Sequence, residues 1–219
     1  MTMELLDYLK EAQKNNVNLG QEIYQYFCTT DLPRLSALKT RIEQVRLLKV
    51  KGSSKKARSF RGKQSRHVGL LLERLMLLLL GGCSCLKVDT NVNSTTAEID
   101  YLVRIGPDAS LFPMFREAGT HAIGEAKCVS AAPSTEWINE LAGILATHGA
   151  SLGFLFTAAP PKKLAHHART AVALHCVAGK TIVLFGFTQV QRVLNGENFL
   201  EVLTHQYVST RSHTSSLSV

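Results

Sequence analysis

This 219-residue sequence has no long apolar run that is free of charge. Its most apolar stretch, residues 68–80, is too short to span a bilayer and contains Glu73 and Arg74. The first sixteen residues (MTMELLDYLKEAQKNN) are rich in charge and include neither an apolar segment nor a small-residue cleavage site of the kind found in signal peptides. We therefore expect a cytoplasmic protein that makes no use of a membrane.

Cysteine is also scarce. The five cysteines are an odd number at irregular spacing, which argues against a disulfide framework and favours a reducing compartment. Cys83 and Cys85, with Cys128 or His121, offer a few zinc-ligand types, but there is no C-x₂-C pair and no second half-site. Zinc is therefore not expected.

Two common catalytic motifs are missing. There is no G-x-S-x-G segment to present a serine nucleophile. Gly179-Lys180-Thr181 would need a glycine at position 174 to complete a phosphate-binding P-loop, and that residue is leucine. The sequence therefore argues against ATP hydrolysis by this chain.

Acidic residues are nearly absent between residues 34 and 66. This segment contains twelve Lys or Arg and one acid, Glu43, for a balance of +11, whereas the rest of the chain has 13 basic and 16 acidic residues, or −3. A basic block beside a mildly acidic domain favours a polyanionic partner, and the alternative is a solvated helix face followed by a basic loop. We expect nucleic acid to contact Lys51, Lys55, Lys56, Arg58, Arg61, Lys63 and Arg66, with Gln64 as a weaker candidate.

The apolar pattern predicts a helical, basic N-terminal module over residues 1–58, an α/β domain over 59–208 and a flexible tail over 209–219. In the module we expect helices over 3–28, interrupted near 15–20, and over 32–48, then a polar linker over 51–59. In the domain we expect a mixed central sheet flanked by helices. Its predicted strands are 85–92, 97–105, 120–129, 152–157 and 181–187; its helices are 65–80, 134–149, 161–178 and 189–203, with a loop over 106–119.

The strand over residues 97–105 alternates in polarity. Ile99, Tyr101 and Val103 are predicted to share its core face, and Asp100 to lie on the opposite face.

Glu125 and Lys127 are two residues apart in the next predicted strand, so their side chains project from one face, roughly 7 Å apart along the chain. Charges inside an apolar strand are costly unless a partner or an ion compensates them. If this strand adjoins that of Asp100, two carboxylates converge on one spot, with the Ala126 carbonyl as a further ligand; such hard oxygens suit Mg²⁺. Lys127 could then hold the attacking water. The alternative is a solvent-facing ion pair on an edge strand.

These residues resemble the motifs of the PD-(D/E)xK nucleases, the restriction-endonuclease-like superfamily. Ile99-Asp100 matches the aspartate motif, with isoleucine in place of the family's proline, and Glu125-Ala126-Lys127 matches the E-x-K motif. Glu73 matches the helix glutamate that often precedes them. The resemblance covers about residues 62–187 and implies a restriction-endonuclease-like fold.

The resemblance also implies function: hydrolysis of phosphodiester bonds in nucleic acid, most often DNA and less often RNA, with Mg²⁺ or with Mn²⁺ in its place. Asp100 and Glu125 would bind the metal, Glu73 would support the metal or its water, and Lys127 would position the nucleophile. Restriction, phage defence or recombination would be the setting. A homodimer or higher oligomer, or an activating partner subunit, fits this family.

A different class of function remains open. The chain could be a catalytically inactive nucleic-acid-binding or assembly subunit that keeps the fold. In that case the basic segment over residues 34–66 would carry the function, and the carboxylates would be residual.

Overall fold

The computed structural model describes residues 5–15, 18–48, 52–93, 98–127, 133–158 and 165–215. Lys51 and Cys128, both considered above as site residues, lie outside these ranges. Within them, no helix has the length and apolar character needed to cross a bilayer. The helices are α1 (Leu5–Lys14), α2 (Leu19–Phe27), α3 (Leu32–Leu47), α4 (Lys55–Gly81), the 3₁₀ helix η1 (Pro107–Leu111), α5 (Pro113–Ala118), α6 (Thr135–Thr147), α7 (His166–Val177), α8 (Phe187–Leu194) and α9 (Phe199–Ser215).

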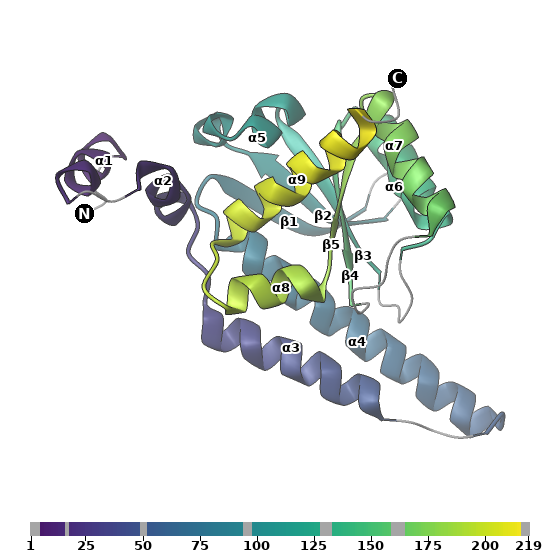
Figure 1. Cartoon of the computed structure of the whole chain (residues 1–219). Helices are drawn as coiled ribbons and strands as arrows, with labels where there is room; N and C mark the ends of the chain where they lie inside the picture. The colour runs from purple at the N-terminus through teal and green to yellow at the C-terminus, as the bar shows by residue number, and fades with distance from the viewer. Residues whose placement is uncertain are drawn as a thin grey trace.

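Five strands form one mixed sheet in the order β1-β2-β3-β4-β5 (Figure 1). The strands β1 (Leu86–Asn93), β2 (Glu98–Ile105) and β3 (His121–Lys127) are antiparallel neighbours. The strands β4 (Leu152–Thr157) and β5 (Thr181–Phe185) continue the sheet parallel to β3. Parallel neighbours need a crossover, and α6 and α7 provide the two that occur here. The predicted α/β class, with a mixed sheet flanked by helices, is confirmed.

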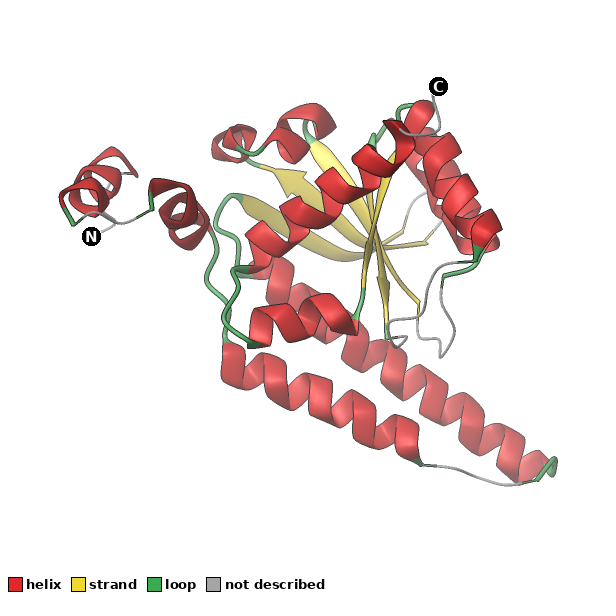
Figure 2. Ribbon diagram, viewed as in Figure 1, coloured by secondary structure: helices red, strands yellow, loops and turns green. Residues whose placement is uncertain are grey.

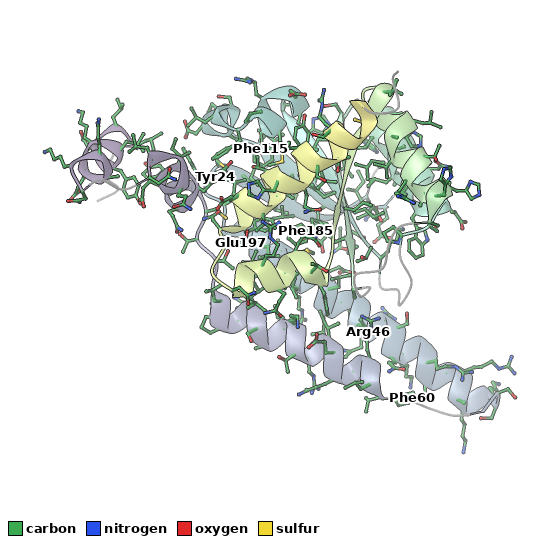
Figure 3. All side chains as sticks on the ribbon, in the orientation of Figure 1. Tyr24, Arg46, Phe60, Phe115, Phe185 and Glu197 are labelled. Atoms are coloured by element: carbon green, nitrogen blue, oxygen red, sulfur yellow. The ribbon has the colours of Figure 1, made fainter. Side chains whose placement is uncertain are left out.

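Helices cover both faces of the sheet (Figure 2). One face packs against α4, α8 and α9 in a large apolar cluster that includes Leu75, Phe156, Phe185 and Phe199. The other face packs against α6 and α7 in a smaller cluster that includes Ile138 and Leu155. Figure 3 shows Phe115 and Phe185, both buried, within the sheet domain.

Ile99 departs from the predicted pattern. Tyr101 and Val103 pack in the cluster on the α4 side, as members of one strand face should, whereas Ile99 packs in the cluster on the α6 side. The prediction that all three share a face was therefore wrong for Ile99. The backbone pairing of β2 with β3 ends at Tyr101, and the ladder with β1 skips Asp100, between the pairs Tyr101–Thr90 and Ile99–Val92, where Asn91 of β1 has a φ of 51°. The regular alternation of β2 is therefore interrupted between Tyr101 and Ile99.

Helices α3 and α4 form a hairpin that extends beyond the sheet (Figure 1). Leu35, Ile42 and Val45 on α3 are buried, as the helical period predicted, and Asp31 caps the helix by accepting a hydrogen bond from the Arg34 N–H at 3.0 Å. Figure 3 shows Arg46 and Phe60 on this hairpin, which we call the α3–α4 arm.

The polar linker expected over residues 51–59 is shorter than predicted. Ser54 caps the N-terminus of α4 by accepting a hydrogen bond from the Ala57 N–H at 3.2 Å, and the helix runs without a break from Lys55 to Gly81. The expected boundary between residues 58 and 59 therefore lies inside one helix. Lysine, alanine and arginine are good helix formers, and burial of Ala57 anchors this first turn.

Three further expectations are corrected. Residues 106–119, expected as a loop, contain η1 and α5, which bury Ala109, Met114 and Phe115. The single helix expected over 189–203 is two helices, α8 and α9, separated around Gly196, whose φ of 102° lies in the region that favours glycine. Residues 209–215, expected as part of a flexible tail, continue α9.

The expected helix over 161–178 begins at His166, after the extended N-cap residue Ala165; residues 161–164 lie outside the described ranges.

A short β-bridge joins α2 to the end of α4. Cys28 and Cys83 lie opposite each other with their Sγ atoms 2.7 Å apart. The Thr29 N–H donates to the Gly82 carbonyl at 2.9 Å, and a Cβ on Gly82 would stand 2.4 Å from the Thr29 oxygen. Glycine is therefore needed at residue 82 for the chain segments to approach this closely.

Candidate functional site

The first feature of the site is the point at which β2 and β3 stop pairing. The last backbone pair of the two strands is Tyr101 with Gly124. One residue earlier in β2, the Asp100 carboxylate accepts a hydrogen bond from the Ala126 N–H at 2.7 Å. A side-chain oxygen thus takes the place of a strand carbonyl, so Asp100 is fixed beside Glu125 and Lys127.

Glu125 is a buried charged residue in the middle of this arrangement. It is only 5% exposed, and its Oε2 lies 3.2 Å from the Lys127 Nζ. Burial, followed by the nearby Asp100 carboxylate, raises the pKa of Glu125 to about 7, although Lys127 acts in the opposite direction. This side chain therefore changes charge near neutral pH, and a cation bound beside it would favour the charged form.

Lys127 has two acidic partners. Its Nζ lies 3.2 Å from Glu125 and 3.4 Å from the Oε2 of Glu140 on α6. Burial acts against the charge, but these two carboxylates outweigh it and raise the pKa of Lys127. The ammonium therefore stays protonated and is held by residues from two elements. Sequence reasoning missed Glu140, because an exposed acid on an amphipathic helix carries no signal of its own.

Glu73 reaches the same group from α4. It is half-buried, and burial, followed by the charges of Asp100 and Glu98, raises its pKa. Burial also raises the pKa of Asp100, against the opposing effect of its hydrogen bond from Ala126. Glu73 and Glu125, predicted from separate segments, are thus each close enough to Asp100 for its charge to raise their pKa values.

Tyr101 adds a group that the sequence analysis had assigned only to the core. Its side chain is 1% exposed, and its ring packs edge-on against Phe156 with centroids 5.8 Å apart. Among the described residues its hydroxyl has no hydrogen-bond partner. Burial, then the charges of Asp100 and Glu73, raise its pKa. A buried donor without a partner is unusual in a protein core.

The donor chemistry fits a magnesium ion only in part. Across the described ranges there is no group of three or more His, Cys, Asp or Glu side chains arranged to hold a metal. Mg²⁺, however, is often bound through one or two carboxylates and keeps several waters or substrate phosphate oxygens. Asp100 and Glu125 could provide two such carboxylates, and Glu73 is near enough for the charge of Asp100 to raise its pKa.

The basic residues lie on the outer half of α4. Lys55, Lys56, Arg58, Lys63 and Arg66 are all exposed. In the described part of the chain none of these five has an ion-pair partner. They therefore form a surface of free positive charge.

Arg61 and Gln64, also on α4, form hydrogen bonds within the α3–α4 arm. Arg61 donates to the Gly52 carbonyl at 2.9 Å. Gln64 donates to the carbonyls of Val45 and Leu48, the latter at 2.8 Å, at the C-terminal end of α3. Gln64, expected as a weaker phosphate contact, therefore has its amide bound at the C-terminal end of α3, where the Val45 carbonyl also accepts a hydrogen bond from the Leu48 N–H.

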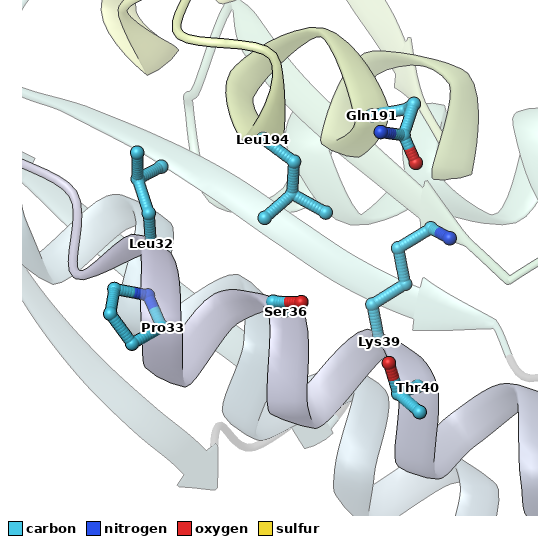
Figure 4. A pocket seen from close by; sticks show the side chains of 7 residues that line it. All are labelled: Leu32, Pro33, Ser36, Lys39, Thr40, Gln191 and Leu194. Carbon is cyan, nitrogen blue, oxygen red and sulfur yellow. The ribbon is translucent and has the colours of Figure 1, made fainter.

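A separate groove lies between α3 and α8 (Figure 4). It has a volume of about 480 Å³, and its lining residues include none of Glu73, Asp100 and Glu125. Lys39 reaches over this groove, 2.7 Å from Glu43 and with its Nζ 5.7 Å from the centre of the Phe187 ring. The groove is lined by Leu32, Pro33, Ser36, Lys39, Thr40, Gln191 and Leu194.

Comparison of the chain with protein-family models, with curated proteins and with solved structures gives no match. The case for any function therefore rests on the residues themselves. Asp100, Glu125 and Lys127 lie where the pairing of β2 with β3 ends, and Lys127 is close to two carboxylates. Helix α4 carries both Glu73 and the exposed basic residues.

Proposed function

We propose that this chain is a metal-dependent nuclease that hydrolyses phosphodiester bonds in DNA, with a restriction-endonuclease-like arrangement of its site. The observation that carries the proposal is the meeting of Asp100, Glu125 and Lys127 at the end of the β2–β3 pairing. Structural ion pairs are usually exposed, whereas Glu125 is buried with its pKa raised to about 7. Residues with pKa values shifted in this way are concentrated at functional sites.

In this proposal Asp100 and Glu125 hold Mg²⁺ or Mn²⁺, with the Ala126 carbonyl as a further ligand and Glu73 binding one of its waters. The metal, when bound, polarises the scissile phosphate and lowers the pKa of a coordinated water. Asp100 is already oriented by its hydrogen bond from the Ala126 N–H. Glu125 loses its proton near pH 7, so it can bind a cation at neutral pH.

Lys127 contributes a fixed positive charge. Its ammonium remains protonated because Glu125 and Glu140 hold it. It can donate a hydrogen bond to the attacking water and offset the negative charge that develops on the phosphate oxygens. Tyr101, whose buried hydroxyl lacks a partner among the described residues, provides a second donor toward the same region.

The test is cleavage of plasmid and single-stranded DNA with Mg²⁺, with Mn²⁺ and with a chelator. Asp100→Asn keeps an oxygen for the Ala126 N–H but removes the charge, and Lys127→Met keeps the length of the side chain. Each should lower metal-dependent cleavage by about 10²–10⁴-fold with little loss of stability. Lys87→Met, at an exposed position on β1, is the matched control and should cleave like the parent. Cleavage that survives both site variants would refute this assignment.

A second function is favoured by a different observation, the free basic surface on α4. A non-catalytic subunit would bind nucleic acid through this surface, and the carboxylates would have no part in it. That reading predicts salt-sensitive binding, unchanged in Asp100→Asn, and no cleavage in either metal.

A further inference from the structure

Helix α4 joins the basic surface directly to the carboxylate site. Lys55 and Glu73 belong to one unbroken α-helix and are eighteen residues apart. At 3.6 residues a turn this is five full turns, so the two side chains leave the same side of the helix, roughly 27 Å apart along its axis. Arg66, seven residues before Glu73, lies on this side as well.

The side of α4 between these residues is open. Lys55, Arg58, Lys63 and Arg66 are exposed and have no ion-pair partner in the described part of the chain. A Cβ placed on Gly62, between the two ends of the row, would meet no atom within 4 Å. Among the described residues, no atom therefore stands against the helix backbone at Gly62, in the middle of a row of positive charges.

The chemistry of this row favours a rigid polyanion. A single strand is usually bound by aromatic side chains on which its bases stack. The first twelve residues of α4 (KKARSFRGKQSR) contain one aromatic residue, Phe60, five residues after Lys55 and therefore on another side of the helix. A straight row of unpaired cations instead matches the phosphates of a duplex, which is stiff over far longer distances.

We infer that α4 aligns duplex DNA along its length, so that the site needs a duplex tract of fixed minimum length on one side of the cleaved bond. This inference rests on the proposed function, since it takes Glu73 to mark the position of the scissile phosphate. The roughly 27 Å from Lys55 to Glu73 corresponds to about eight base pairs at 3.4 Å each. The substrate class is therefore double-stranded DNA with at least this flank.

The first experiment measures binding with a chelator present, so that no catalysis is required. The full chain is titrated with fluorescent DNA duplexes of random sequence from 6 to 20 base pairs, beside a Lys55→Glu/Lys56→Glu variant. We expect the variant to lose at least tenfold in affinity for 20 base pairs and less than threefold for 6, because a short duplex centred on Arg66 does not reach the outer turn. Equal losses at all lengths would overturn the inference.

The control has the same change of charge elsewhere. Lys10→Glu/Lys14→Glu alters two exposed lysines on α1, which lies apart from the arm (Figure 1). It should affect long and short duplexes alike. A length-dependent loss in this control too, or binding of a 20-nucleotide single strand or a 20-base-pair RNA duplex as tightly as the DNA duplex, would also overturn the inference.

The second experiment separates this inference from the proposed function. With Mg²⁺, end-labelled duplexes should resist cleavage within about eight base pairs of an end on one side of the cut, and this protected margin should shrink in Lys55→Glu/Lys56→Glu. Cleavage up to both ends would refute the alignment by α4 and leave the nuclease intact. Absence of cleavage, with the length-dependent binding retained, would refute the nuclease and leave the duplex surface.

Discussion

The two halves of α4 place charge in opposite environments. In the outer half, Lys55, Lys63 and Arg66 are exposed and free of ion pairs within the described ranges. In the inner half, Glu73 stands half-buried near Asp100, among leucines that are fully buried. An exposed charged side chain contributes little to the free energy of unfolding, so its replacement should leave the protein folded. Buried acids of like sign destabilise the fold, so their presence calls for a cation or a substrate that compensates them.

The largest effect on stability should come from the apolar side of the inner half. Leu75 is fully buried in the cluster between α4 and the sheet, whereas Leu70, on the same helix, is 46% exposed. Leu75→Ala should lower the free energy of unfolding by about 2–5 kcal/mol, because it leaves a cavity. Leu70→Ala, the matched control, should change it by about 0.5 kcal/mol or less. Urea unfolding measures both, and similar losses would contradict the described packing of α4.

The next effect tests the cost of the buried acid. The pKa of Glu125 is about 7 in the folded chain against its ordinary 4.5, so between these pH values the folded state holds a proton that the unfolded chain has released. The contribution of Glu125 to the free energy of unfolding is therefore fully present below pH 4.5 and is lost as the pH rises to about 7.

Glu125→Gln should accordingly raise the free energy of unfolding at pH 8 by roughly 1–3 kcal/mol and leave it nearly unchanged at pH 4. Lys127 keeps one carboxylate, Glu140, in the variant. Glu11→Gln, at an exposed position on α1, is the matched control and should change the free energy of unfolding at pH 8 by about 0.5 kcal/mol or less. Thermal unfolding across this pH range measures the difference; a loss of stability at pH 8 would mean that the pair with Lys127 outweighs the burial of charge.

The smallest effect separates structure from binding in the outer half. Gln64 donates to two carbonyls at the end of α3, and its neighbour Lys63 is exposed. Gln64→Ala should lower the free energy of unfolding by about 1 kcal/mol, while Lys63→Ala should leave it unchanged and reduce the salt dependence of DNA binding by about one phosphate contact. The reverse result would assign phosphate contact to Gln64 after all.

Much of the fold could be predicted from periodicity. The strands of the sheet and the buried side of α3 follow from apolar residues at spacings of two and of three to four, and they fall close to the expected places. The ends of elements were harder. The polar start of α4 was predicted to be a linker. It is helical because Ser54 caps it and Ala57 is buried. The helices within 106–119 depend on the burial of Met114 and Phe115, which no local pattern reveals.

The candidate site divides in the same way. Asp100, Glu125 and Lys127 could be chosen from the sequence because charge inside an apolar strand needs an explanation. Glu140 could not, since it reaches Lys127 only through the packing of α6 against the sheet. Tyr101 had the pattern of a core residue, and only its surroundings leave its hydroxyl without a partner among the described residues.

The sequence by itself determined the α/β class, the uneven charge and the residue types that a metal site needs, because these depend on composition and on short-range spacing. The tertiary structure alone decided which charges meet. The end of the β2–β3 pairing lets Asp100 bond the strand of Glu125, and one continuous α4 places Glu73 and the row from Lys55 to Arg66 on a single rigid element. The first depends on contacts between distant segments, which spacing along a chain does not encode, and the second on the burial of Ala57 together with the local cap of Ser54.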